Sequence, residues 1–308
     1  MYKYIIKRVL QLFLVVIGVS LFIYIIMDFA PGDIVLSIVG EDATAEEYEA
    51  VRESLGLNDP LIVRYGRYMW NLLHGDLGYS YKYKMPVWTL YSQRVGATFL
   101  LAFSATVVSL AFSIPLGIYT ALHQGSIQDN VASAFSMIGL AAPNFWVGLM
   151  LILAFSLHLG WFHSGGFNSF ADVILPAITV GTGHIAMDTR TTRSSMIDVI
   201  RQDYLMLARA KGCKESKVIT KHALKNALIP IITAAGIQFT TSLGGSTVTE
   251  SVFSWPGVGK LVIDAVKSQD IDTVTGSIIM TSIIASAILL LIDILYAFVD
   301  PRIKARYK

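Results

Sequence analysis

The sequence predicts an all-α membrane protein with about six transmembrane helices and a small helical cap outside the membrane. Three observations support this prediction. Apolar residues make up 54% of the 308 residues and charged residues only 15%, whereas a soluble domain has about 25% charged residues. Several uncharged stretches approach or exceed the roughly 20 residues that a helix needs to cross the hydrocarbon core. The basic residues gather in regions that six crossings place on one side.

The predicted spans follow the uncharged stretches of the chain. Helices are the only reasonable structure for such long runs, because a backbone in lipid must satisfy its own hydrogen bonds. The first run follows Lys3, Lys7 and Arg8 and is longer than the apolar core of a signal peptide, which favours a true first helix. The fourth run is shorter and contains Pro176. The six spans lie at about residues 9–29, 96–120, 131–157, 172–193, 227–250 and 273–298.

The distribution of Lys and Arg predicts the orientation of the chain. Nine basic residues accompany four acidic ones between Asp188 and Lys225, and the C-terminal tail is basic as well. The positive-inside rule places these regions and the N-terminus in the cytoplasm. The expected parts are a cytoplasmic N-terminus with the first helix (1–30), an extracytoplasmic segment (31–94), a transmembrane domain (95–300) with a cytoplasmic loop (194–226), and a cytoplasmic tail (301–308).

The extracytoplasmic segment has helical patterns of its own. Thr44 followed by Glu47 predicts a capping box at the start of one helix. Pro60 predicts the first position of a second helix, which Gly75 would end. The segment is therefore expected to form a small helical cap. Its helices could equally be packing elements without a ligand-binding role.

The sequence contains no convincing catalytic, metal or nucleotide site. His158, His163 and Asp172 make only a weak metal candidate, and the single Cys213 excludes an internal disulfide. The stretch 256–261 looks like the end of a phosphate-binding loop but lacks the first Gly and the Ser or Thr after Lys. We therefore expect neither an enzyme nor a chain that binds a cofactor or metal.

Four acidic residues lie in or near the predicted spans. An intramembrane charge is a functional hypothesis by default. All four are expected near span ends, where they can reach water, which argues against a proton relay. They are Asp28, Asp188, Glu250 and Asp293.

The most informative segment lies in the predicted cytoplasmic loop. Residues 203–212 predict a short helix that Gly212 ends, followed by a second, basic helix that leads into the fifth span. Asp203 and Lys211 at its two ends suit the helix dipole. Ala208 and Ala210 leave a surface with little side-chain bulk. From these residues alone, the helix could dock into another protein, or the basic loop could merely fix the topology.

A family resemblance favours docking. The segment resembles the signature cytoplasmic loop of binding-protein-dependent ABC importers, in the form found in the dipeptide, oligopeptide and nickel permeases, first subunit type. It lacks the acidic start of the generic motif, and Pro230 falls later than in the generic form. Short motifs in family order extend the resemblance along the whole chain. The stretches that carry it include 4–8, 30–33, 75–78, 143–146, 203–212, 222–230, 250–259 and 300–302.

The resemblance implies a type I ABC importer permease fold and a function. The chain would be the permease subunit of an ATP-driven importer of dipeptides or oligopeptides in the bacterial cell membrane. The alternatives are an importer of nickel or another metal chelate, and an ATP-independent channel or carrier. The implied partners are a homologous second permease, two ATPase subunits that bind ATP and magnesium, and an extracytoplasmic substrate-binding protein. No nucleic-acid partner is expected.

The resemblance also implies two sets of site residues. The first would couple the chain to the ATPases, and the second would form an outer gate or a docking site for the binding protein. The coupling residues are Asp203, Tyr204, Ala208, Arg209, Ala210, Lys211 and Gly212. The outer residues are Glu250, Phe253, Trp255, Pro256 and Gly257.

Overall fold

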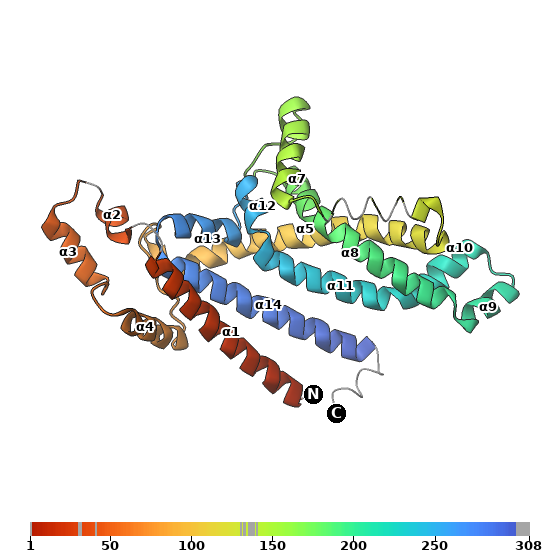
Figure 1. Cartoon of the computed structure of the whole chain (residues 1–308), viewed down its shortest axis with the longest axis horizontal. Coiled ribbons are helices and arrows are strands. Elements are labelled where there is room, and N and C mark those ends of the chain that lie inside the picture. The colour runs from red at the N-terminus through yellow and green to blue at the C-terminus, as the bar shows by residue number, and fades with distance from the viewer. Residues whose placement is uncertain are drawn as a thin grey trace. The chain divides into compact units, whose positions relative to one another are not determined.

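The computed structural model describes residues 2–29, 33–40, 42–129, 131, 134, 139 and 141–299. These residues are mainly helical (Figure 1) and divide into two compact units. Unit 1 comprises residues 1–99 and 254–287, and unit 2 comprises residues 100–253 and 288–308. The predicted basic tail 301–308 and much of the first half of the predicted third span lie outside the described residues.

Unit 1 contains the N-terminal helices and the segment that follows them. Long α1 (Tyr2–Phe29) precedes three short helices and a two-stranded antiparallel hairpin, and α13 and the start of α14 return to the unit from the far end of the chain. The hairpin was not predicted. The bounds are α2 (Ile34–Val39), α3 (Ala45–Ser54), α4 (Leu61–Leu73), β1 (Tyr79–Ser80), β2 (Met85–Pro86), α5 (Val87–Leu122), α13 (Val258–Lys267) and α14 (Ile271–Val299).

The two helices predicted after the first span are present. Thr44 and Glu47 form the reciprocal capping box at the start of α3. Pro60 stands one position earlier than predicted, as the residue preceding α4. The hydroxyl of Tyr65 on α4 lies 3.0 Å from that of Ser20 on α1 and donates to the Ile17 carbonyl at 3.1 Å. These contacts hold α4 against α1.

Unit 2 is built around α8 (Ile174–Ile200) and α11 (Leu224–Gly245), which pack against each other. The C-terminal part of α5 and the end of α14 also belong to it. The helix that continues into α11 starts at residue 215 and includes a π-helical turn. The remaining elements are α7 (Asn144–Leu151), η1 (Ile152–His158), η2 (Phe170–Val173), α9 (Asp203–Ala210), α10 (Glu215–Lys217), η3 (Val218–Ala223) and α12 (Thr247–Val252).

Small residues allow the helices of unit 2 to approach closely. A Cβ atom on Gly117 of α5 would lie 2.5 Å from the Thr192 Cβ and 2.9 Å from the Thr189 carbonyl oxygen of α8. Such contacts are typical of membrane helices, which associate through close packing because lipid provides no hydrophobic force between them.

Five helical stretches among the described residues are long and apolar enough to cross a membrane. They are 9–29, 87–122, 170–200, 215–245 and 271–294, and a shorter apolar helix covers 144–158. The helices of the fourth and fifth spans extend beyond the predicted cytoplasmic boundaries, to Ile200 and from Glu215. The predicted boundaries stand at charged residues, but the helices continue past them, and two of the charged residues concerned are paired: Arg193 with Asp129 and Glu215 with Arg209.

Candidate functional site

The predicted short helix in the loop 194–226 is α9, and it is anchored by one buried side chain. Leu205 is fully buried in an apolar cluster with Met196 of α8 and with Val218, Ile219 and residues of α11. Ala208 packs at the edge of the same cluster. The side chain of Ala208, which we expected on the exposed surface with little bulk, is therefore partly buried.

The opposite face of α9 is apolar and exposed. Tyr204, Met206 and Leu207 have relative exposures of 41%, 58% and 57%. The Tyr204 hydroxyl accepts a hydrogen bond of 2.7 Å from the Asn226 side chain at the start of α11. Large apolar groups on a short helix that is held from behind are suited to contact with another protein. The prediction from sequence missed Met206 and Leu207, although both lie within the motif.

The C-terminal end of α9 is a Schellman motif, and Gly212 is its left-handed residue. Gly212 has a φ of 76°. Its N–H donates to the Arg209 carbonyl at 2.9 Å, and the Cys213 N–H donates to the Ala208 carbonyl at 3.2 Å. This pattern of bonds satisfies carbonyls that a helix end would otherwise leave unpaired. The predicted stop at Gly212 is thus confirmed.

Arg209 links α9 to the helix that follows. Its guanidinium donates to both carboxylate oxygens of Glu215, with its Nε 3.0 Å from Oε2 and its Nη2 2.8 Å from Oε1. This bidentate pair raises the pKa of Arg209 above its ordinary value. The Schellman turn and the ion pair therefore fix the direction of α9 relative to α10, η3 and α11.

The predicted outer residues are mostly interior. Glu250 and Phe253 of unit 2 are buried, and so are Trp255 and Gly257 of unit 1, while Pro256 is half-buried. Glu250 accepts a hydrogen bond from the Ser246 hydroxyl at 3.1 Å. The Trp255 indole N–H donates to the Ala97 carbonyl at 3.0 Å. A role for these residues as an outer gate or docking site stays a prediction.

The stretch that resembles a phosphate-binding loop has another structural role. Residues 258–267 form α13, and the Val258 N–H, which a phosphate would need, donates to the Thr98 hydroxyl at 2.8 Å. The weak metal candidate is likewise otherwise engaged, because the His163 Nδ1 lies 2.7 Å from a carboxylate oxygen of Asp172.

One prediction about intramembrane acids is wrong. Asp188 does not lie near a span end that reaches water. It lies inside α8, is 1% exposed, and accepts hydrogen bonds from Ser109 Oγ of α5 at 2.6 Å and from Gln238 Nε2 of α11 at 2.7 Å. Glu250 is also buried. The sequence predicts a span that ends at residue 193, with Asp188 close to that end, whereas α8 continues to Ile200 and hydrogen bonds from two neighbouring helices bury Asp188 within it.

Comparisons with known proteins agree with the fold. A family model described as "binding-protein-dependent transport system inner membrane component" matches residues 113–305, and the model of its N-terminal part matches residues 1–102. A methionine ABC transporter, solved in inward-facing conformations, matches with a TM-score of 0.56 over 68% of this chain and 96% of that chain. At 18% identity this similarity supports the fold alone.

Curated relatives are similar over the full length. An oligopeptide transport system permease protein of Bacillus subtilis is 40% identical over 99% of this chain and 100% of that protein. A glutathione transport system permease protein of Pectobacterium atrosepticum is 38% identical over 100% of both chains. A dipeptide transport system permease protein of Escherichia coli K12 is 35% identical over 99% of both chains.

Proposed function

The chain belongs to the family of inner membrane components of binding-protein-dependent transport systems, and from this premise we propose that it imports short peptides. It is a multi-pass permease of an ABC importer, a component distinct from the nucleotide-binding subunits. An importer of this kind works with an ATPase and a substrate-binding protein. The observation that carries the proposal of peptides as cargo is the full-length similarity to three relatives named for oligopeptide, glutathione and dipeptide transport. It favours peptides over a nickel chelate.

The proposed assembly has two permeases and two ATPases. A homologous second permease pairs with this chain, two ATPase subunits bind ATP and magnesium on the cytoplasmic side, and a binding protein delivers peptides from outside. Both termini are cytoplasmic, the segment 31–94 is an extracytoplasmic cap, and the complex lies in the bacterial cell membrane. The basic residues in the loop 194–226 and in the tail support this orientation.

In this proposal α9 transmits motion from the ATPases to the spans. ATP binds more tightly to the state in which the ATPases are closed, and this difference in affinity shifts the permease between its conformations. The exposed side chains of Tyr204, Met206 and Leu207 form the contact surface. Leu205 and the Arg209–Glu215 ion pair carry the displacement to the helix that becomes α11.

Uptake into proteoliposomes tests the function. The complex is purified from its own membranes through a tag on this chain, reconstituted with its binding protein and loaded with ATP, and uptake of labelled trialanine is measured. ATP-dependent uptake that excess nickel does not inhibit is the expected result. Uptake that proceeds equally without ATP would identify a carrier, and uptake of a nickel chelate in place of trialanine would refute the assignment of peptides.

Cross-linking tests the contact surface. Cys213 is the single cysteine, so a Cys213→Ser background allows one reporter thiol at a time. Met206→Cys is expected to form a disulfide with a cysteine placed in the ATPase groove, and the yield should change when ATP is added. Thr220→Cys, which is exposed on the following helix, is the matched control. Equal yields from both positions would contradict the proposed surface.

A further inference from the structure

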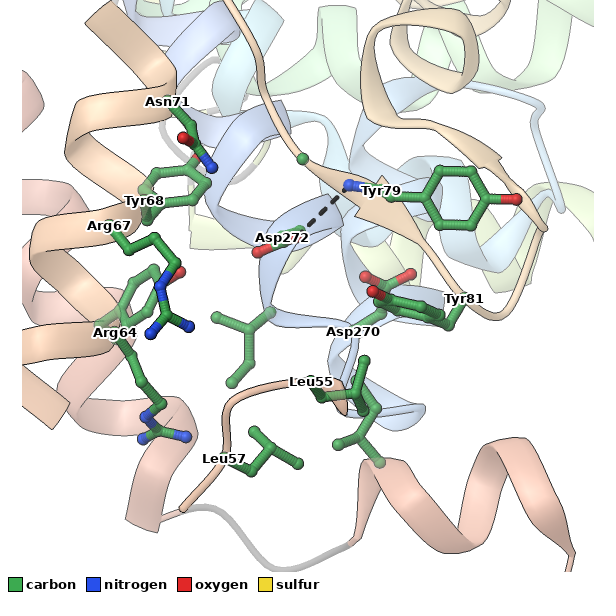
Figure 2. A pocket seen from close by; sticks show the side chains of 14 residues that line it. Leu55, Leu57, Arg64, Arg67, Tyr68, Asn71, Tyr79, Tyr81, Asp270 and Asp272 are labelled. Carbon is green, nitrogen blue, oxygen red and sulfur yellow. Dashed lines mark hydrogen bonds between the residues drawn. The ribbon is translucent and has the colours of Figure 1, made fainter. Parts of the chain in front are cut away.

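Unit 1 contains a cavity that the coupling function does not use. Its volume is about 160 Å³, or roughly five times the share of volume of a water molecule in the liquid. Figure 2 shows α4 on one side of it, with Arg64, Arg67 and Tyr68, and Asp270, Asp272 and the hairpin tyrosines on the other. Leu55 and Leu57 form part of an apolar wall.

On the acidic side of the cavity, one of the two carboxylates receives few hydrogen bonds from the protein itself. Asp270 is engaged, since it accepts from the hydroxyls of Ser80 and Thr273. Asp272 accepts a single hydrogen bond among the described residues, from the Tyr79 N–H, at a long 3.4 Å (Figure 2). Tyr81 lies on the same side, next to Asp270, whereas the ring of Tyr79 points away from the cavity (Figure 2). A carboxylate with few partners of its own and an aromatic residue nearby is suited to binding an ammonium group.

The α4 side of the cavity has polar groups without partners. Tyr68 is only 5% exposed, and its hydroxyl has no hydrogen-bond partner among the described residues. The Arg64 Nε is also buried and unpaired within the described part of the chain, although the Arg64 guanidinium pairs with Asp28 through Nη2. Arg67 pairs with Asp59. Buried donors without partners are costly to a fold and are expected to be satisfied by water, an ion or a ligand.

From this arrangement we propose that the cavity binds a small zwitterion, namely an amino acid or one end of a short peptide. The ammonium group lies at Asp272 and the carboxylate on the α4 side, where Arg64 Nε and the Tyr68 hydroxyl, both buried in the structure, become its donors after a shift of the two side chains. The described residues contain no cluster of three or more metal-ligating side chains, which disfavours a metal ion. A lysine from a docking protein would satisfy Asp272 but would leave the α4 side unpaired, so the two-sided charge favours a zwitterion.

The choice of a peptide as the zwitterion rests on the proposed function, whereas the site itself does not. If the zwitterion is a peptide, this site would bind it on the permease itself before the transport pathway opens. This site shares no residue with α9, so its variants are expected to leave ATP hydrolysis by the complex unchanged.

Binding to the complete permease–ATPase complex in nanodiscs, without ATP and without the binding protein, tests the site. The probes are labelled trialanine, N-acetyl-trialanine and trialanine amide, measured by equilibrium dialysis. We expect trialanine to bind, and both blocked forms to bind at least about tenfold more weakly, because each loses one charge-assisted interaction. Asp272→Asn keeps the side-chain size and is expected to weaken trialanine binding by a similar factor.

Two tyrosine variants on the same helix separate binding from folding. Tyr68→Phe removes an unpaired hydroxyl, so it should leave the melting temperature unchanged or raised while weakening trialanine binding about threefold to tenfold. Tyr65→Phe removes a hydroxyl that is bonded to Ser20 and Ile17, so it should lower the melting temperature and leave binding unchanged.

Three results would overturn the inference. They are the absence of saturable trialanine binding, equal binding of the three probes, and Tyr68→Phe and Asp272→Asn variants that bind trialanine as the wild type does. If those variants instead weaken only the docking of the binding protein, the occupant is a side chain of that protein. Each of these results is compatible with peptide uptake by the complex, so a failure here is distinguishable from a failure of the proposed function.

Discussion

Replacement of Gly212 is the sharpest test of how α9 transmits motion. Gly212 has a φ of 76°, and a Cβ atom built there would meet nothing within 4 Å. A side chain at this position therefore causes no clash, and its cost is the left-handed backbone alone. For an L-residue that cost is about 1–2 kcal/mol, which corresponds to a roughly 5- to 30-fold shift in population.

We expect Gly212→Val to weaken the Schellman turn and to free α9 from its fixed direction. The complex should still assemble and hydrolyse ATP, but the number of peptides imported per ATP should fall about fivefold or more. Gly212→Asn is the matched control, because Asn tolerates the left-handed region, and it should stay close to the wild type. Gly212→Ala should lie between the two.

The assay measures uptake of labelled peptide and release of phosphate in the same proteoliposomes. Wild-type coupling in Gly212→Val would refute the role of the helix end. An equal loss in Gly212→Asn and Gly212→Val would refute the backbone argument and would indicate that any side chain here obstructs the contact with the ATPase.

Three further predictions concern stability. Asp188→Leu should lower the melting temperature in detergent by removing two interhelical hydrogen bonds, at a cost of about 1–3 kcal/mol, whereas Asp188→Asn should lower it less; equal effects would contradict the account of its partners. Hydrogen bonds from Arg193 hold the pKa of Asp129 below its ordinary value. The contribution of this pair to the free energy of unfolding is therefore complete above the unfolded pKa of about 3.9 and is lost as the pH falls through the lower folded pKa. Asp129→Asn should therefore reduce the loss of stability on acidification, and an unchanged acid profile would refute this. Thr44→Ala removes the capping box and should speed hydrogen exchange in α3, consistent with a loss of about 0.5–2 kcal/mol; unchanged exchange would mean that tertiary contacts alone hold this helix.

Much of the architecture could be read from local patterns. The uncharged runs predicted long apolar helices because lipid imposes one requirement on every backbone, whatever the neighbours, and five such helices are present among the described residues. The capping box at Thr44 and the stop at Gly212 were predictable because each depends on residues a few positions apart. The family and the transport function followed from motifs whose order extends over the whole chain.

What the sequence did not determine depends on which residues meet across the fold. Charge alone placed Asp188 at a span end, and only the packing of α5, α8 and α11 provides the two donors that allow it to be buried. The family resemblance implied an outer role for Phe253 and Trp255, and only the structure shows that both side chains are buried. The cavity beside α4 was likewise invisible, because Tyr68 and Asp272 are about 200 residues apart. The sequence by itself determined helix type, the capping box at Thr44, the stop at Gly212 and the family, since these depend on local backbone chemistry and on motif order. The tertiary structure decided which polar groups are buried, paired or left without partners, since burial depends on contacts between distant segments.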